Sequence, residues 1–491
     1  MIATDSTVEI LGFYVNGKWE RPQGCTLGTV TNPATGAIIA EAPYAGEADI
    51  DGAVRAAHEA FPKWREVPVV DRVQPLYGYK ALLEKHHAEL AGILTRENGK
   101  TAEDARAEVR RSIQMVEVAC GMPSLMMGDS LNDVAHGIDC KTIRQPIGVC
   151  VGITPFNFPA MVPMWMWPFA IACGNTFILK PSEKAPLTAT RAVELLHDAG
   201  LPPGVLNLVH GGKQAVDALL RHPLVKAVSF VGSTPVAKYI YATAAAEGKR
   251  VQALGGAKNH LVVMPDADMP KAVEAIIGSA FGAAGERCLA GSVLVTVGDA
   301  AGPLLDLLVK RTKGLVVGDG SEAGVEMGPL VTSDHCQRVA AYIEKGVAEG
   351  ATPLVDGREL KKGAPSGPGG FFLGPTIFDH VTPEMTIARE EIFGPVLCVT
   401  RVETLDEAIQ LVNRSPFGNA TAIFTASGKA AREYSSRIEV GMVGINVGVA
   451  APMAFFPFAG WKNSFFGDLH AHGKDAVAFY TEQKVIMSRW F

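Results

Sequence analysis

The stretch IGVCVGITPFNFPAMVPMWMWPFAIACGNTFILKPSEKAPLTATRAVELLHDAGLPPGVLNLV, residues 147–209, decides the fold class of this 491-residue chain. Short apolar runs alternate in it with segments of helical periodicity, and the alternation continues to residue 247. Strands that alternate with helices form a parallel, doubly wound α/β sheet, which binds ligands at the carboxyl ends of its strands. We predict strands at 147–153, 176–179, 205–209 and 227–231, and helices at 161–173, 186–199, 213–221 and 234–247.

Part of this stretch, from Gly148 to Leu179, has no charged side chain and is long enough to suggest a membrane-spanning helix. Its prolines at 155, 159, 163 and 168 would break such a helix, so we expect a buried core segment and no membrane partner. The formal net charge of −6 comes without a long run of Lys or Arg, so we expect no nucleic acid partner either.

The flanking segments predict a larger molecule around this sheet. Asn16-Gly17 lies between two short apolar runs, which predicts a hairpin with a type I′ turn. An alternating pattern over 477–491 predicts an exposed edge strand, and such a strand usually pairs with another chain. Helical periodicity is found at 48–64, 71–97, 101–120 and 269–283, and the strands of a second α/β unit are predicted at 292–297, 396–402, 420–424 and 441–445.

The eight cysteines are scattered along the chain, with no C-x-x-C pair and no His/Cys cluster at zinc spacing. We therefore expect no metal site and interpret the cysteines as free thiols of a cytoplasmic protein. The first five residues lack the basic and apolar regions of a secretion signal, which agrees with a cytoplasmic location.

Two motifs at predicted strand ends are candidates for binding a dinucleotide, although no G-x-G-x-x-G fingerprint follows any strand. Lys180 and Glu183 can both bond to ribose hydroxyls, and the carboxylate would repel a 2′-phosphate, which favours NAD over NADP. The alternative is a surface turn with a solvated charge pair. Gly232-Ser233 leads from a strand into a helix whose N-terminal N–H groups suit a pyrophosphate, or Ser233 is an ordinary N-cap.

Cys288 is the candidate nucleophile, because it follows a helix that ends in glycines and therefore lies on an irregular turn. Those glycines would let a substrate approach the backbone, and Arg287 would favour the reactive thiolate. The alternative is a buried, inert cysteine. An attacked aldehyde becomes an oxyanion, and Asn157 is placed at a strand end where its amide could donate to it. Asn157 could equally be a structural turn residue.

Taken together, these motifs resemble the aldehyde dehydrogenase superfamily along nearly the whole chain. The resemblance implies that Cys288 is the nucleophile and that Asn157, with the Cys288 backbone N–H, forms the oxyanion hole. It also implies a set of cofactor contacts: Thr154, Phe156, Lys180, Glu183, Lys184, Gly232, Ser233, Gly255, Glu391 and Phe393. The motifs that carry it are Pro155-Phe156-Asn157-Phe158-Pro159, Lys180-Pro181-Ser182-Glu183, Phe230-Val231-Gly232-Ser233, Leu254-Gly255-Gly256, Gly285-Glu286-Arg287-Cys288 and Glu390-Glu391-Ile392-Phe393-Gly394-Pro395.

The resemblance further implies a division into three parts and a homotetramer built as a dimer of dimers. The implied fold is a doubly wound NAD-binding domain, an α/β catalytic domain and a small β oligomerisation arm. The predicted NAD-binding domain comprises 1–125 and 145–260, the catalytic domain 261–465, and the arm with its tail 126–144 and 466–491.

One departure from the family pattern concerns the second half of the reaction. Hydrolytic members of the superfamily have Glu immediately before Leu-Gly-Gly, where it activates water, and this chain has Ala253 there. Such a base typically contributes about 10²–10⁴-fold, so we expect coenzyme A rather than water to take the acyl group. The alternatives are a water-hydrolysing dehydrogenase and a protein that binds without turnover.

Three further motifs are similar to the methylmalonate-semialdehyde dehydrogenase branch of the superfamily, which also acts on malonate semialdehyde. The resemblance implies oxidation with decarboxylation to propanoyl-CoA or acetyl-CoA, and a substrate carboxylate held by Arg111 and Arg287. A guanidinium fork suits a carboxylate, and the alternative for Arg111 is a solvated helix charge. The motifs are Gly256-Ala257-Lys258-Asn259-His260, Met126-Met127-Gly128-Asp129 and Ala451-Pro452-Met453-Ala454-Phe455-Phe456-Pro457-Phe458.

Overall fold

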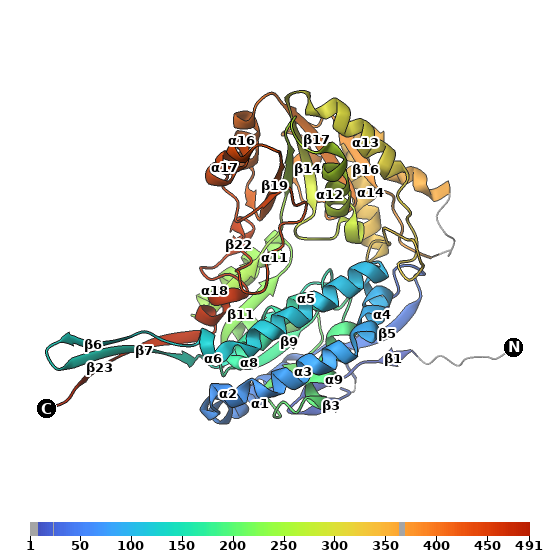
Figure 1. The fold of residues 1–491 in the computed structure, drawn as a ribbon. Coiled ribbons are helices and arrows are strands. Elements are labelled where there is room, and N and C mark those ends of the chain that lie inside the picture. The colour runs from blue at the N-terminus through green and yellow to red at the C-terminus, as the bar shows by residue number, and fades with distance from the viewer. Residues whose placement is uncertain (1–7, 23, 363–368) are drawn as a thin grey trace.

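The computed structural model describes residues 8–22, 24–362 and 369–491. Two large sheets, each covered by helices on both faces, make up the body, and a narrow β arm projects from it (Figure 1). The prediction that concerns the first five residues falls outside the described residues. No helix in the described part of the chain is both long enough and apolar enough to cross a membrane.

The first sheet is the doubly wound sheet that the sequence predicts. Its five central strands are parallel, and β8 lies between β9 and β11, so the strand order reverses direction at β8. Ligands of such sheets bind at this reversal, beyond the carboxyl ends of the strands. In spatial order the strands are β22 (Phe465–Phe466), β12 (Arg250–Leu254), β11 (Val225–Val231), β8 (Val149–Ile153), β9 (Thr176–Lys180), β10 (Leu206–Leu208), β2 (Phe13–Val15) and β3 (Lys18–Glu20).

The turn between β2 and β3 has the predicted geometry, because Asn16 (φ 49°) and Gly17 (φ 79°) are both left-handed, as a type I′ turn requires. Apolar cores fill both faces of the sheet. One face is covered by α1 (Glu47–Glu66), α10 (Lys213–Arg221) and α11 (Thr234–Ala246). The other is covered by α3 (Gln74–Lys85), α4 (His87–Asn98), α5 (Ala102–Cys120), α8 (Trp167–Ala172) and α9 (Leu187–Asp198).

Two predicted helices are interrupted. The pattern over 71–97 is divided among α2 (Val69–Arg72), α3 and α4, and the pattern over 161–173 is divided between α7 (Met161–Met164) and α8. Pro75 and Pro168 occupy the first turns of α3 and α8, where the missing N–H is tolerated. A proline inside a continuous helix would remove a hydrogen bond and clash with the preceding turn, so the chain starts a new helix instead.

The second sheet begins where the chain leaves β12, so the Gly255-to-Lys258 segment crosses from one sheet to the other. Its strands are β15 (Thr352–Val355), β16 (Thr376–Asp379), β17 (Val396–Val402), β14 (Gly291–Val297), β13 (Asn259–Val263), β19 (Ala420–Phe424) and β20 (Met442–Ile445), all parallel except β15. Its helices are α12 (Met269–Ala280), α13 (Ala301–Lys313), α14 (Ser333–Ala348), α15 (Thr386–Arg389), α16 (Leu405–Arg414) and α17 (Gly428–Arg437).

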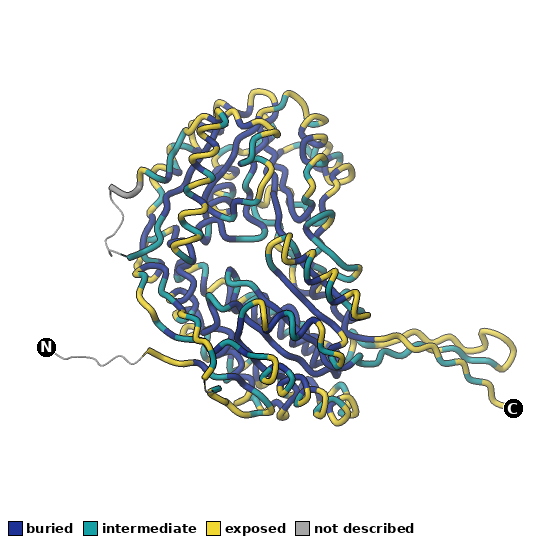
Figure 2. Tube along the Cα trace, turned by 180° about the vertical axis from the view of Figure 1, so that it is seen from behind, coloured by how far each residue is buried: buried dark blue, intermediate teal, exposed yellow. Residues whose placement is uncertain are grey.

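The arm is an antiparallel sheet of β6 (Ser130–Ala135), β7 (Ile138–Pro146) and β23 (Thr481–Arg489), with β7 in the middle. Its residues are largely exposed (Figure 2), among them Leu131, Val485 and Met487. The predicted strand over 477–491 begins later than expected, because residues 477–479 end α18 (Gly473–Phe479), which packs against α8 in the body. Within the predicted tail, only β23 therefore lies in the arm.

Three further pairings complete the fold. Near the N-terminus β1 (Glu9–Ile10), β5 (Ile38–Pro43) and β4 (Leu27–Thr31) form a small sheet, and β18 (Phe417–Gly418) pairs with β21 (Trp461–Lys462). The short helix α6 (Met122–Leu125) leads from α5 toward the arm.

Candidate active site

A cavity of about 690 Å³ opens at the carboxyl ends of β8, β9, β11 and β12. Its walls come from both sheets, because residues that precede β17 and residues of α14 also line it. Every residue predicted to bind the cofactor lines this cavity. These residues are Thr154, Phe156, Lys180, Glu183, Lys184, Gly232, Ser233, Gly255, Glu391 and Phe393.

The structure thus brings all of these side chains and glycines together around one space, although they come from five separate segments of the chain.

Lys180 and Glu183 form one end of the cavity. The Lys180 side chain is 5% exposed and its Nζ lies 3.3 Å from Glu183 Oε2, so this is not a solvated surface turn. Burial lowers the pKa of Lys180. Burial opposes ionisation of Glu183 as well, but Lys180 and the other nearby donors outweigh it and hold the pKa of Glu183 below its usual value. Glu183 is therefore a carboxylate that faces the cavity.

Gly232 and Ser233 lie where β11 passes into α11. Ser233 occupies the N-cap position of α11, but its side chain makes no capping hydrogen bond, so the ordinary N-cap role is not observed. The N-terminal N–H groups of a helix attract anions. A Cβ on Gly232 would lie 2.4 Å from the ring of Phe230, which explains the glycine at this point of the cavity wall.

Glu391 and Phe393 form the opposite end of the cavity. Glu391 Oε1 accepts a hydrogen bond from Ala257 N (2.9 Å), and a Cβ on Gly256 would lie 2.2 Å from Glu391 Oε2. Only glycine therefore fits beside the Glu391 carboxyl group. Burial raises the pKa of Glu391. The rings of Phe393 and Phe156 meet edge to face, with their centroids 6.0 Å apart.

Cys288 lies on a wall that this cavity shares with a smaller one. The chain reaches it through the 3₁₀ turn η1 (Gly282–Gly285), where Ala283, Ala284 and Gly285 are all left-handed. The Cys288 carbonyl accepts hydrogen bonds from Asn259 Nδ2 (2.8 Å) and Asn419 Nδ2 (2.9 Å), which fix the backbone at the thiol.

Asn157 is buried at the end of β8 and lines the same cavity. Its Nδ2 donates to the backbone oxygen of Glu286 (2.9 Å), two residues before Cys288. An amide nitrogen carries two hydrogens, so the second one is left for another acceptor. The amide is thus tied to the segment that carries the thiol.

The smaller cavity has a volume of about 230 Å³ and is lined by both predicted carboxylate-binding residues, Arg111 and Arg287, together with Cys288. Arg111 Nη2 donates to the backbone oxygens of Ala451 (3.3 Å) and Pro452 (3.1 Å). Among the described residues, no carboxylate forms an ion pair with this guanidinium. Arg287, in contrast, is already paired, with its Nη2 2.6 Å from Asp104 Oδ1.

Comparison with known proteins agrees with this geometry. The model of the aldehyde dehydrogenase family matches residues 19–486. The chain belongs to this family. It is 54% identical over 483 residues to malonate-semialdehyde dehydrogenase 2 of Geobacillus kaustophilus, a match that covers 98% of this chain and 99% of that protein. These values confirm the family resemblance predicted from the sequence.

Solved structures of dehydrogenases have the same fold. A methylmalonate-semialdehyde dehydrogenase from Oceanimonas doudoroffii superposes with a TM-score of 0.96 at 50% identity, covering 98% of this chain and 99% of that one. A structure from Sinorhizobium meliloti, assigned to the same enzyme and complexed with NAD, gives a TM-score of 0.96 at 46% identity and covers 99% of both chains.

The position of the water-activating base of hydrolytic aldehyde dehydrogenases needs a correction. Ala253 is fully buried in the apolar core under α11, whereas Leu254 belongs to the core on the other face of the sheet, against which Cys288 packs. Successive side chains of a strand point to opposite faces. Leu254, rather than Ala253, therefore lies on the side of the sheet where Cys288 packs. Both positions are apolar.

The expected surroundings of Cys288 also differ from the structure in two respects. A Cβ on Gly285 would lie 2.3 Å from the oxygen of Gly394, so this glycine makes room for the chain itself rather than for a substrate. Burial, and to a smaller extent Glu391, raise the pKa of the Cys288 thiol to about 12, and the lowering effect of Arg287 is too weak to compensate. Arg287 thus acts in the predicted direction, toward the thiolate, but its effect is smaller than that of burial.

This pKa predicts how the free thiol reacts. In the protein without ligands, we expect the rate of Cys288 alkylation by iodoacetamide to rise from pH 7 to pH 10 without a plateau. The thiolate is the reacting species, and its fraction keeps increasing with pH until the pH exceeds the pKa. The measurement is mass-spectrometric labelling at position 288 as a function of pH, with Cys140 as an internal reference. A plateau below pH 8 would contradict the assignment.

Four further residues with ionisable side chains line the larger cavity of this aldehyde dehydrogenase and were not predicted: Lys213, Tyr239, His335 and Arg338. His335 Nε2 donates to the backbone oxygen of Phe393 (2.7 Å), and Arg338 Nη2 to that of Glu391 (3.3 Å). These residues lie on helices, not at strand ends, so the strand-end argument could not find them. No spacing in the sequence links α14 to the segment before β17.

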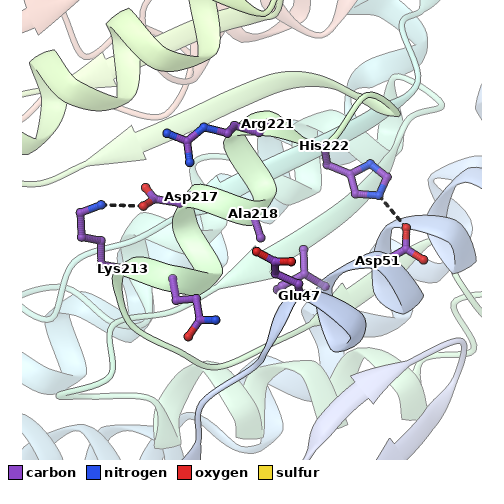
Figure 3. Close-up of a pocket in the computed structure, with 9 residues that line it drawn as sticks. Glu47, Asp51, Lys213, Asp217, Ala218, Arg221 and His222 are labelled. Atoms are coloured by element: carbon purple, nitrogen blue, oxygen red, sulfur yellow. Dashed lines mark hydrogen bonds and ion pairs between the residues drawn. The ribbon is translucent and has the colours of Figure 1, made fainter.

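A third hollow, of about 680 Å³, lies between α1 and α10 (Figure 3). Its charges are largely paired, because Lys213 Nζ lies 2.5 Å from Asp217 Oδ2 and His222 Nε2 lies 3.1 Å from Asp51 Oδ1. Of the residues predicted for the site, none lines this hollow. It meets the larger cavity only at Lys213, which lines both.

Proposed function

We propose that this aldehyde dehydrogenase oxidises short acidic semialdehydes, namely malonate and methylmalonate semialdehyde, with NAD as oxidant and coenzyme A as acyl acceptor. The observation that carries the proposal is Arg111, a half-buried guanidinium that has no carboxylate partner among the described residues and shares a small cavity with Cys288. Water screens charges less in a partly buried cavity than at the surface, so an anion bound there would be attracted strongly to Arg111. The names of the relatives agree with such a substrate.

The residues of the larger cavity fit NAD. The hydroxyl of Thr154 is buried and without a hydrogen-bond partner in the described part of the chain, as expected for a group that awaits a ligand. Lys180 and Glu183 would hold a ribose, and the Glu183 carboxylate would repel a 2′-phosphate. Ser233 and the α11 N-terminus would hold the pyrophosphate, and Glu391 with Phe393 the nicotinamide ribose. When bound, NAD supplies the acceptor for a hydride.

Cys288 performs the covalent chemistry. Its thiolate attacks the aldehyde carbon, and the carbonyl oxygen becomes an oxyanion that Asn157 Nδ2 and the Cys288 backbone N–H stabilise. Loss of a hydride from that carbon gives an acyl-thioester on Cys288. The acyl group then loses its carboxylate as CO₂ and gains a proton. Attack by the thiol of coenzyme A forms acetyl-CoA or propanoyl-CoA and releases the Cys288 sulfur.

Coenzyme A is favoured over water because the carboxylates of both cavities are already engaged. Glu183 is bound to Lys180, Asp104 to Arg287, Glu108 to Lys100, and Glu391 to the Ala257 N–H. The position before the two glycines is Leu254, which cannot activate water. A thiol is a better nucleophile toward a thioester and needs no such base.

For the assembled enzyme we propose a homotetramer, a dimer of dimers, in the cytoplasm. The arm supports the assembly, because β6 and β23 form its two edges and apolar side chains are exposed along it. The eight cysteines support the location, because none of them forms a disulfide in the described part of the chain.

The substrate proposal is tested by replacing Arg111. For Arg111→Leu we expect kcat/KM to fall about 10- to 100-fold with malonate and methylmalonate semialdehyde, the range for loss of a hydrogen bond to a charged group. With propanal, which has no carboxylate, the change should stay within about threefold. The measurement is NADH formation with coenzyme A present, with the acyl-CoA product identified by mass.

Arg110→Leu is the matched control, because Arg110 is the exposed neighbour on α5 and lies near Glu84 and Glu117 instead of the cavity. It should leave all three substrates unaffected. An equal loss of activity on propanal and on the acidic substrates in Arg111→Leu would refute carboxylate recognition by Arg111.

A further inference from the structure

The backbone around Asn157 is held by three side chains from one segment, the end of α4 and the first half of α5. Asn98 Nδ2 donates to the oxygen of Phe156 (3.0 Å), and Lys100 Nζ donates to the oxygen of Asn157 itself (2.8 Å). Glu108 Oε1 accepts from the N–H groups of Ala160 (2.9 Å) and Met161 (3.1 Å). Hydrogen bonds therefore fix the chain immediately before, at and after the oxyanion-binding amide.

Lys100 and Glu108 also bind each other, with Nζ and Oε2 2.5 Å apart and side chains that are only 1% and 0% exposed. The Lys100 Nζ further lies 4.4 Å from the centre of the Phe158 ring. Desolvation of two such charges offsets much of their attraction, so a buried ion pair is a poor means of stabilising a fold. What the pair provides is a fixed position for the groups it contacts.

The Asn157 amide is connected to the nucleophile on its other side. Its Nδ2 donates to the oxygen of Glu286, and the Cys288 carbonyl is held by Asn259 and Asn419. The donor and the thiol are thus fixed from two independent directions. A shift of about 1 Å in a preorganised donor can lower a rate by about 10²-fold.

We propose that Lys100 and Glu108 are positioning residues, which hold the Asn157 backbone so that the second N–H of its amide is directed at the oxyanion formed on the Cys288 adduct. The inference rests on the proposed function, because it assumes the oxyanion role of Asn157. Neither residue touches the reacting atoms. Glu108 also lines the smaller cavity, so the test must show that the effect of the pair on the rate passes through Asn157.

The test uses the neutral double variant Lys100→Met/Glu108→Gln, which leaves no unpaired buried charge. Gln can still accept the N–H groups of Ala160 and Met161, so the main loss is the donor to the Asn157 oxygen. In single-turnover measurements with malonate semialdehyde, we expect the rate constant of NADH formation to fall about 10- to 100-fold, less than the loss of a whole oxyanion donor. The Kd for NAD should stay unchanged.

Two further variants separate positioning from general loss of structure. Asn98→Ala removes the bond to Phe156 without touching a charge and should lower the same rate constant by a smaller factor. Glu97→Gln is the matched control, because Glu97 is equally buried and adjacent in sequence but bonds to the N–H groups of Leu187 and Thr188. It should change thermal stability and leave the rate constant unaffected.

The decisive measurement repeats the double variant in an Asn157→Ala background. If Lys100 and Glu108 act through Asn157, their effect disappears there, because the donor they position is gone. Losses that multiply in the combined variant would overturn the positioning role and leave the proposed function standing. If Asn157→Ala itself has the wild-type rate constant, the oxyanion role fails, and the positioning role fails with it.

Discussion

Cys288→Ala is expected to lower NADH formation from malonate semialdehyde by at least about 10⁴-fold, the scale on which removal of a nucleophile lowers enzymatic rates. Without the sulfur no tetrahedral adduct forms, so no hydride is released from the aldehyde carbon. The Kd for NAD should be unchanged, because the cofactor contacts lie along the rest of the cavity. The measurement is NADH absorbance together with a binding titration.

Intact mass of the wild-type protein gives the complementary result. After substrate and NAD are added without an acceptor, the acyl group should be found on Cys288. Cys140→Ala is the control, since Cys140 is a partly exposed thiol in the arm, and this variant should keep full activity and the adduct. Full activity in Cys288→Ala would refute covalent catalysis. Binding of NAD by the wild type without NADH formation across a panel of aldehydes would instead indicate a non-catalytic protein.

Much of the larger cavity could be predicted from strand ends. Lys180 ends one strand of the parallel sheet and Gly232 follows another, and the carboxyl ends of those strands meet at one edge, whereas Gly255 came from the family resemblance. This rule needs only the order of strands and helices, which apolar periodicity reveals. The residues on α14, such as His335, reach the cavity through the packing of the second sheet, and no local pattern predicts that packing.

The details around the nucleophile depended on contacts between distant segments. Arg287 precedes Cys288 in sequence, but Asp104 on α5 binds its guanidinium and burial dominates the pKa of the thiol. The face of the sheet to which Leu254 points depends on the register of β12, and a motif that contains one extra residue does not define it. Sequence motifs therefore pointed to Arg287 and Cys288, but the groups that contact them come from distant segments and could be identified only from the fold.

Withholding coenzyme A is expected to lower steady-state turnover by about 10²–10⁴-fold, the contribution that a positioned base would make to the attack of water. The first turnover needs no acceptor, so NADH should appear as a burst of about one equivalent per active site and then nearly stop. Stopped-flow absorbance with and without coenzyme A measures both phases. Equal steady-state rates under the two conditions would mean that the enzyme hydrolyses its thioester with water.

A pair of variants tests why water attacks so slowly. Leu254→Glu introduces a carboxylate on the face of the sheet where Cys288 packs, and it should raise the rate of coenzyme A-independent turnover. Ala253→Glu introduces the same group one residue earlier, in the apolar core under α11, where burial would keep it neutral and destabilise the protein. That variant should gain no hydrolysis. A gain in Ala253→Glu without one in Leu254→Glu would show that β12 presents its other face to the thioester, and would return the missing base to position 253.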